Sequence, residues 1–142
     1  MRMLPRANSL TALLVRTDFS SDEAWQRVCD EAQREYDDGF SADLVLVSDP
    51  AFGRASWEAV RATVPASNDG PAVLFVADEV TLHTPGHLVL VVDLVDDGHA
   101  PIRCIPPELW AVENNLNIAN MSWADFADAV EYDGVFRGFP EV

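Results

Sequence analysis

The sequence predicts one three-layer α/β domain, with a mixed sheet of roughly five strands and helices at its C-terminal end. Three apolar runs alternate with two helical segments, which is the pattern of parallel strands joined by crossover helices. Two later apolar runs are separated only by the turn-rich segment VDDGHA, so we expect an antiparallel hairpin there. The length of 142 residues suits a single domain over residues 1–142.

The first strand is predicted at residues 10–16, where LTALLVR is apolar up to its closing arginine. A helix should follow, because Ser20 and Glu23 have the spacing of a capping box. Apolar side chains then recur at helical spacing from Trp25 to Tyr36. We expect this apolar side of the helix to pack against the sheet.

Two further strands and a hairpin are predicted along the middle of the chain. The segment DLVLVSDP at residues 43–50 reads as a buried strand that runs into a proline turn. A short helix over residues 56–64, stopped by a proline, leads to a third apolar strand at residues 72–78. The hairpin should pair residues 87–94 with residues 101–106.

The C-terminal third is predicted to be helical, in two pieces that are broken at the segment NIANM. The first piece covers residues 108–117. Ser122 has the position of the N-cap of the second piece, with Asp125 at its third helical position. Met121 and Phe126 occupy the two positions of a hydrophobic staple, so we expect them to fix the entry of this helix.

The charged residues exclude several classes of protein. All nine basic residues are arginine, so the chain cannot form a lysine Schiff base, a Walker-type phosphate loop or a lysine general base. The formal net charge of −15 and the scattered arginines argue against a nucleic-acid partner. The familiar G-x-S-x-G, C-x-x-C and G-x-G-x-x-G motifs are absent, which argues against the common hydrolases, redox proteins and dehydrogenases.

The apolar segments predict a protein of the cytoplasm. Cys29 and Cys104 stand among apolar neighbours and should be buried thiols. The N-terminal segment is interrupted by Pro5, Arg6 and Asn8, and no 18-residue apolar stretch follows it, so we expect neither a signal peptide nor a membrane span.

Polar side chains follow all three of the predicted parallel strands. They are Thr17 and Asp18, Ser48 and Asp49, and Asp78. Open α/β sheets bind ligands at this edge, so the carboxylates of Asp18 and Asp49 are candidate ligands for Mg²⁺ or a cationic group. The alternative, which the residue types favour, is that they form turns and helix caps.

The three histidines do not predict a zinc site. His83 and His87 are four residues apart, but Pro85 and Gly86 between them exclude a helical pair, so a pair of loop histidines is expected. We therefore predict no metal and no cofactor.

The predicted helix over residues 108–117 contains the best catalytic candidate. At about 100° per residue, Glu113 lies only about 40° from Leu109, on the boundary of the buried stripe. Trp110 and Asn117 lie on the same flank, so an aromatic ring, a carboxylate and an amide would converge.

Two interpretations of Glu113 remain open. Desolvation would raise its pKa and suit it to act as a general acid or base. Alternatively, Glu113 and Asn117 hydrogen-bond exposed backbone near the two breaks that flank the helix, and we favour this structural role modestly. Arg16, which closes the first strand, is the cation that we expect to meet such a network.

Several long blocks of the sequence, LLVRTDFSSDEAW and PPELWAVENNLNIANMSWADFADAVEYDGVFRGF among them, resemble a family of small actinobacterial proteins classed as a domain of unknown function. The resemblance runs from about Leu10 to Phe139 and implies a cytoplasmic, stand-alone domain. It transfers no catalytic residue. The second block matches the family at positions that we would test first, namely Glu113, Asn114, Asn115, Asn117 and Asn120.

Two functions of different classes are consistent with these observations. The first is a regulatory or immunity-like interaction module that presents its acidic surface to a basic protein partner. The alternative is a small cofactor-free enzyme, a cyclase or isomerase, in which Glu113 transfers protons and Trp110 stacks on an aromatic or cationic substrate. A condensation of the Pictet–Spengler type would suit an acidic pocket, because its iminium intermediate is cationic.

Overall fold

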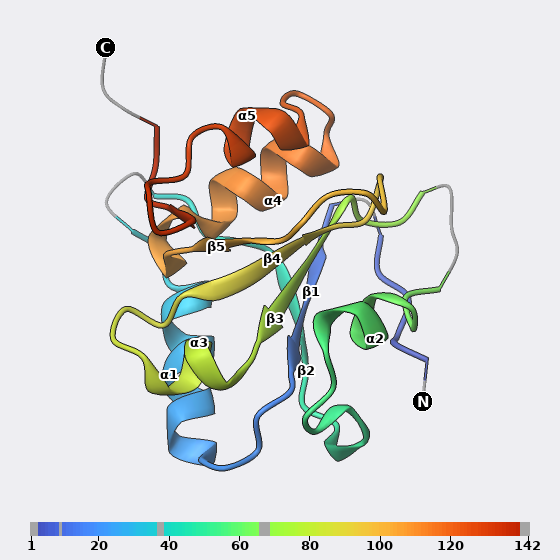
Figure 1. The fold of residues 1–142 in the computed structure, drawn as a ribbon, viewed down its shortest axis with the longest axis vertical. Helices are drawn as coiled ribbons and strands as arrows, with labels where there is room; N and C mark the ends of the chain where they lie inside the picture. Colours follow the sequence, from blue (N-terminus) through green and yellow to red (C-terminus); the bar gives the residue numbers. More distant parts are fainter. Residues whose placement is uncertain (1–2, 9, 37–38, 66–68, 140–142) are drawn as a thin grey trace.

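The computed structural model describes residues 3–8, 10–36, 39–65 and 69–139. Within these ranges the chain forms a six-stranded mixed sheet in the order β2-β1-β3-β4-β5-β6, with helices against both of its faces (Figure 1). The predicted α/β class is confirmed, and the sheet has one strand more than expected. The strands are β1 Ala12–Arg16, β2 Leu44–Val47, β3 Val73–Ala77, β4 Val89–Asp93, β5 Ile102–Cys104 and β6 Val135–Phe136.

The first three strands are parallel, as predicted, and β1 lies between the other two. Leu14 at the middle of β1 stands opposite Leu46 of β2 and Phe75 of β3. The predicted hairpin is also present, because β4 runs antiparallel to both β3 and β5. The strand that the sequence did not predict is β6, which pairs parallel to β5. Its two residues are too few to show an alternating pattern.

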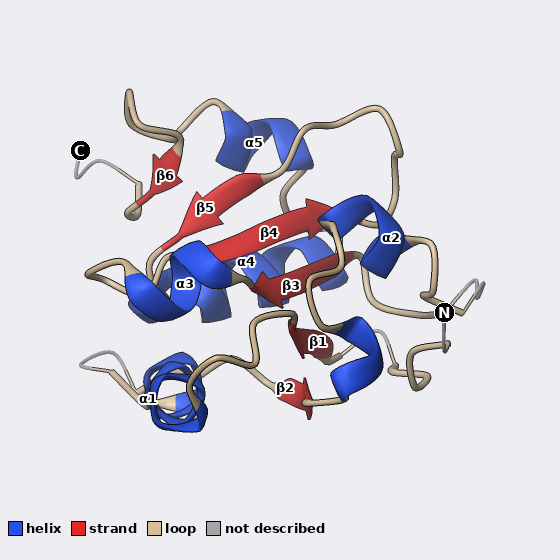
Figure 2. Ribbon diagram, turned by 60° about the horizontal axis from the view of Figure 1, so that its bottom comes forward, coloured by secondary structure: helices blue, strands red, loops and turns tan. Residues whose placement is uncertain are grey.

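The helices lie in two layers on opposite faces of the sheet. In Figure 2, α1 is seen almost end-on beside the edge strand β2, and α4 lies behind β3 and β4. Both of these helices pack against one face of the sheet, whereas α2 packs against the other. The helical elements are α1 Asp22–Gln33, η1 Pro50–Phe52, α2 Trp57–Arg61, α3 Glu79–His83, η2 Pro106–Glu108, α4 Leu109–Asn117 and α5 Trp123–Ala127.

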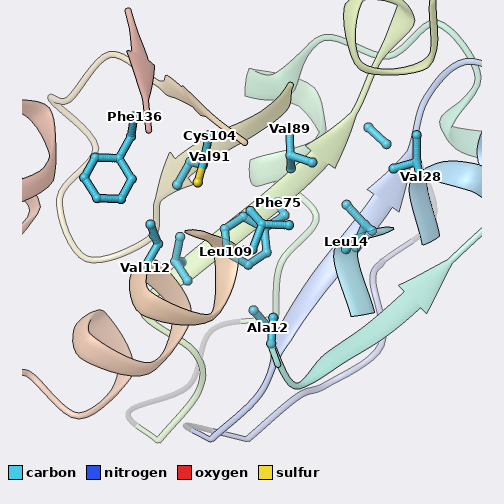
Figure 3. Packing of buried hydrophobic residues seen from close by; sticks show 14 of the residues in the cluster. Ala12, Leu14, Val28, Phe75, Val89, Val91, Cys104, Leu109, Val112 and Phe136 are labelled. Atoms are coloured by element: carbon cyan, nitrogen blue, oxygen red, sulfur yellow. The ribbon is translucent and has the colours of Figure 1, made fainter. Parts of the chain in front are cut away.

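Alternate side chains of the strands enter two separate hydrophobic cores. Leu14 and Phe75 point to one face, where they pack with Leu109 of α4 and with side chains of α1 and α5 (Figure 3). Leu13 points to the other face and packs with Phe52 of η1 and with side chains of α2. Both faces of the central strands are therefore buried, which explains why they read as continuous apolar runs.

The helix caps follow the sequence with one correction. The capping box predicted for Ser20 and Glu23 is wrong, because the N-cap of α1 is Ser21, whose side chain accepts the N–H of Ala24 at 3.1 Å. The hydroxyl of Ser20 is engaged elsewhere. The prediction for α5 is confirmed, since the Asp125 carboxylate accepts the backbone N–H of the N-cap residue Ser122 at 2.8 Å.

Both cysteines are buried free thiols, as predicted. Burial raises the pKa of the Cys29 thiol to about 11. Across the described ranges, none of the helices combines the length and the apolar character that a membrane crossing requires.

Candidate functional site

Glu113 is buried, with only 5% of its surface exposed. Its Oε1 accepts the backbone N–H of Asp43 at 2.9 Å, and its Oε2 accepts the side-chain amide of Asn117 at 3.4 Å. Burial raises the pKa of the Glu113 carboxyl, although the hydrogen bonds from Asp43 and Asn117 act in the opposite direction. The carboxylate is thus partly desolvated, as the helical spacing indicated, and it is held by backbone and amide donors.

Asn117 extends this network to two further strands. Its Oδ1 accepts the backbone N–H of Ala72 at 2.8 Å, and its Nδ2 donates to the carbonyl oxygen of Thr11 at 3.0 Å. Thr11, Asp43 and Ala72 immediately precede β1, β2 and β3. Two side chains of α4 therefore hold the starting ends of all three parallel strands. We refer to Glu113 and Asn117, with these three backbone partners, as the α4 clamp.

Two other predicted site residues do not complete a pocket at Glu113. Trp110 is half-buried and stacks on Phe40, with ring centroids 4.7 Å apart and planes inclined by 16°. Arg16 was expected to meet the Glu113 network, and this prediction is wrong because Arg16 lies at the other end of β1. A strand rises about 3.3 Å per residue, so five residues separate the two ends by more than a side chain can reach.

Arg16 organises the loop that follows β1 instead. Its Nε donates to the carbonyl oxygen of Asp18 at 2.7 Å, and its Nη2 lies 2.9 Å from the carboxylate of Asp22. The guanidinium also lies over the ring of Phe19, 4.3 Å from its centroid. The side chain is only 3% exposed, so these contacts fix residues 17–22 against the end of the sheet.

A cleft of about 930 Å³ opens at this carboxyl end of the parallel strands. Figure 1 shows α3 at this end of β3, with α4 toward the opposite end. The cleft is lined by the loop after β1, the segment between η1 and α2, and the start of α3, so Thr17, Asp18 and Asp78 meet there as predicted. Asp49 is not among the lining residues, because its side chain caps η1 by accepting the N–H of Ala51 at 3.0 Å.

Asp18 joins Ser20 and His83 in a hydrogen-bonded cluster on the cleft wall. Its Oδ1 accepts the Ser20 hydroxyl at 2.6 Å, and the Ser20 Oγ lies 2.7 Å from Nε2 of His83. The same Nε2 is 3.3 Å from Oδ2 of Asp18. Burial raises the pKa of Asp18, but the hydrogen bonds from Ser20 and the charges of His83 and Arg16 together bring it below the ordinary value.

Asp78 is held at the cleft by Arg103, a residue that the sequence did not single out. The two Nη atoms of Arg103 donate to the two carboxylate oxygens of Asp78, at 2.8 Å and 2.7 Å. Asp78 also caps α3 by accepting the N–H of Thr81 at 3.1 Å. Burial raises the pKa of Asp78, yet its bonds to Arg103 and Thr81 lower it overall.

The histidines are separated by the structure. His83 is the last residue of α3 rather than a loop residue, whereas Nδ1 of His87 lies 2.9 Å from the carbonyl oxygen of Thr81. His99 pairs with Asp93 on another part of the surface. In the part of the chain that the structure describes, no cluster of three or more His, Cys, Asp or Glu side chains could hold a metal ion.

Comparison with known proteins places the chain in a family. A search among curated proteins finds no match. A family model described as "Domain of unknown function (DUF6924)" matches residues 11–139, which include both the cleft and the α4 clamp. The predicted resemblance to a domain of unknown function is confirmed, and the chain belongs to the DUF6924 family.

Proposed function

We propose that this domain is a regulatory or immunity-like interaction module that binds a basic protein partner through its acidic surface. The observation that carries the proposal is the way the chain uses its few arginines. Arg16, Arg27, Arg103 and Arg137 each pair with a carboxylate of the same chain. These cations are therefore largely neutralised by carboxylates of the same chain. The formal net charge of −15 thus comes from the remaining carboxylates.

Carboxylates without such partners are distributed over the surface. Glu35 follows α1, Asp97 lies between β4 and β5, and Asp128 follows α5. Each is exposed, and none of their carboxylates has a hydrogen bond or ion pair with the described residues. An excess of unpaired surface charge creates a long-range potential that speeds the encounter with a partner of opposite sign.

The alternative enzyme, with Glu113 as its general acid or base, has less support. Glu113 contributes to the lining of neither the 930 Å³ cleft nor a second cavity of about 400 Å³ near the N-terminus. Its carboxylate oxygens are instead directed at the N–H of Asp43 and the amide of Asn117. Neither proposal needs a cofactor. Because free buried thiols are typical of reducing compartments, we also propose a cytoplasmic location.

The proposal is tested by isolating the partner from host extract at low ionic strength and measuring its association rate with the purified domain. Replacing Glu35 by Gln, Asp97 by Asn and Asp128 by Asn together removes three negative charges and no described interaction. We expect the association rate to fall several-fold in this triple variant and to fall steeply with added salt in the wild type.

A matched control is Gln33→Asn, which changes an exposed residue of α1 without changing the charge. It should associate at the wild-type rate. If no basic protein is recovered at low salt, or if the triple variant binds as fast as the control, the interaction module loses its basis.

A further inference from the structure

Thr17 presents an uncommitted hydroxyl to the cleft at the carboxyl end of the strands. The residue directly follows β1, is only 4% exposed and lines the cleft. Its backbone N–H donates to the carbonyl oxygen of Ala77 at 3.0 Å. Its hydroxyl has no hydrogen bond with the described residues. Among these residues, every fully buried side-chain polar atom has a hydrogen-bond partner. The unpartnered Thr17 hydroxyl is therefore not fully buried, and it is accessible from the cleft that the residue lines.

Arg54 brings an uncommitted cation to the same cleft. It is an exposed lining residue, and its guanidinium has no ion pair or hydrogen bond with the described part of the chain. Its φ of 62° lies in the left-handed region, which is uncommon for a residue other than glycine. The N–H of Arg54 donates to the carbonyl oxygen of Thr17 at 2.8 Å, so a backbone hydrogen bond holds Arg54 in this conformation next to another lining residue of the cleft.

Hydrogen-bond acceptors occupy another part of the cleft wall. The Ser20 hydroxyl donates to Asp18, so Nε2 of His83 supplies the proton that the imidazole shares with the Ser20 oxygen. Asp18 itself lines the cleft, so its carboxylate is one acceptor on this wall. Glu79 adds an exposed carboxylate to the lining.

Apolar groups separate these polar positions. Phe19, Pro50, Ala55 and Val80 all line the cleft, and Val80 is 40% exposed. The guanidinium of Arg16 lies over the Phe19 ring and helps to hold it in place. The cleft thus combines a cation with a hydroxyl, a set of acceptors and an apolar wall, within a volume in the usual range for small-molecule sites.

We propose that this cleft binds a small zwitterion of the amino-acid type with an apolar side chain. Arg54 and Thr17 bind its carboxylate, while the carboxylates of Glu79 and Asp18 accept hydrogen bonds from its ammonium group. A carboxylate fits better than a phosphate, because the nearby carboxylates of Asp18 and Glu79 penalise a dianion more than a monoanion. The site does not depend on the proposed protein partner, since it uses none of the carboxylates assigned to that surface.

The ligands to be tested are L-leucine and L-phenylalanine. Their binding is measured by NMR, from the changes in the amide chemical shifts of the full chain. Both should shift the amide signals of Thr17, Ser20, Arg54 and Val80. Leucine methyl ester, which lacks the carboxylate, and N-acetyl-leucine, which lacks the ammonium group, should each bind at least tenfold more weakly, as should inorganic phosphate.

Two variants test the residues, and a third is the matched control. Arg54→Gln should weaken leucine binding at least tenfold, and Thr17→Val, which keeps the shape of the side chain, at least threefold. Arg6→Gln removes another exposed arginine, one that lines the second cavity, and should leave binding unchanged. The melting temperature of each variant shows whether it is folded. If Arg54→Gln does not fold, Thr17→Val alone tests the site.

The proposal is wrong if neither amino acid shifts these amides at millimolar concentration. It is equally wrong if phosphate, leucine methyl ester or N-acetyl-leucine binds as tightly as leucine. The same holds if Arg54→Gln and Thr17→Val are both folded and both bind leucine like the wild type.

Discussion

The carboxylate of Glu113 and the backbone N–H of Asp43 are joined at 2.9 Å across 70 positions of sequence. Asp43 immediately precedes β2, the outermost of the three parallel strands, so this bond ties the edge of the sheet to α4. The buried carboxylate supplies the acceptor that this backbone N–H requires.

The first prediction separates the two roles of the Glu113 side chain, as a hydrogen-bond acceptor and as a negative charge. Glu113→Ala leaves the Asp43 N–H without its acceptor and should lower the free energy of unfolding by about 1–3 kcal/mol. Glu113→Gln keeps a carbonyl oxygen for the Asp43 N–H, loses only the long 3.4 Å bond from Asn117 and removes a desolvated charge, so it should change stability by less than about 1 kcal/mol at neutral pH. Urea denaturation measures both. A loss in the Gln variant equal to that in the Ala variant would show that the charge itself is required.

The difference in stability between the wild type and Glu113→Gln should change with pH in one direction. Burial raises the pKa of Glu113 in the folded state, so its protonated form favours folding. The stability that this proton contributes is complete below the unfolded pKa and is lost as the pH rises through the folded pKa. The wild type should therefore lose stability relative to Glu113→Gln as the pH rises from acid to neutral. A constant difference across that range would contradict the desolvated carboxylate.

Asn117→Asp tests the donor side of the α4 clamp. The new carboxylate can still accept the Ala72 N–H, but it places an oxygen against the carbonyl oxygen of Thr11 and near the carboxylate of Glu113. We expect a loss of about 1–3 kcal/mol, partly recovered in the double variant with Glu113→Gln. Asn114→Asp, at an exposed position of the same helix, should be nearly neutral. The absence of any coupling in this double-mutant cycle would argue against a shared network.

Asp78→Asn tests the ion pair at the cleft. Burial raises the pKa of Asp78, but its bonds to Arg103 and Thr81 bring it below the ordinary value. Its contribution to stability should be complete above the unfolded pKa of about 3.9 and lost as the pH falls through the lower folded value. At neutral pH the variant should be less stable by about 1–3 kcal/mol, and the difference should shrink in acid. Thermal unfolding of both proteins from pH 7 to pH 2 provides the measurement.

His99 and Asp93 give a prediction for NMR. Nδ1 of His99 lies 2.6 Å from Oδ2 of Asp93, and this hydrogen bond raises the pKa of His99, with a smaller contribution from the charge of Asp96. Its contribution to stability should be present below the unfolded pKa of about 6.5 and lost as the pH rises through the folded value. In Asp93→Asn the titration midpoint of His99 should move down. Asp96→Asn should move it less, and the reverse order would contradict the assignment.

The sequence predicted the features that depend on local pattern. The apolar runs at residues 10–16 and 72–78 identified buried parallel strands, and the segment VDDGHA identified the hairpin. The helical spacing of Glu113 also placed it correctly at the boundary of the core. Each of these predictions uses residues that are neighbours along one strand, turn or helix, where geometry follows directly from position.

The remaining features depend on partners that are distant in sequence. Nothing in the segment around Glu113 indicates Asp43 or Thr11, and the expectation that Arg16 would join that network failed because it required knowing which end of β1 faces α4. The pairing of Ser20 with His83, and the uncommitted guanidinium of Arg54, likewise follow only from the way that two loops and α3 meet at one sheet edge.

The α4 clamp also has a consequence for the order in which the molecule is completed during synthesis. Asn117 bonds the carbonyl oxygen of Thr11 across 106 positions, so the ribosome makes all three parallel strands long before the residue that joins their starting ends. Until then the carbonyl oxygen of Thr11 and the N–H groups of Asp43 and Ala72 depend on water. A nascent chain that ends after β3 thus has three parallel strands whose starting ends are not yet joined, and the translation of α4 supplies the two side chains that join them.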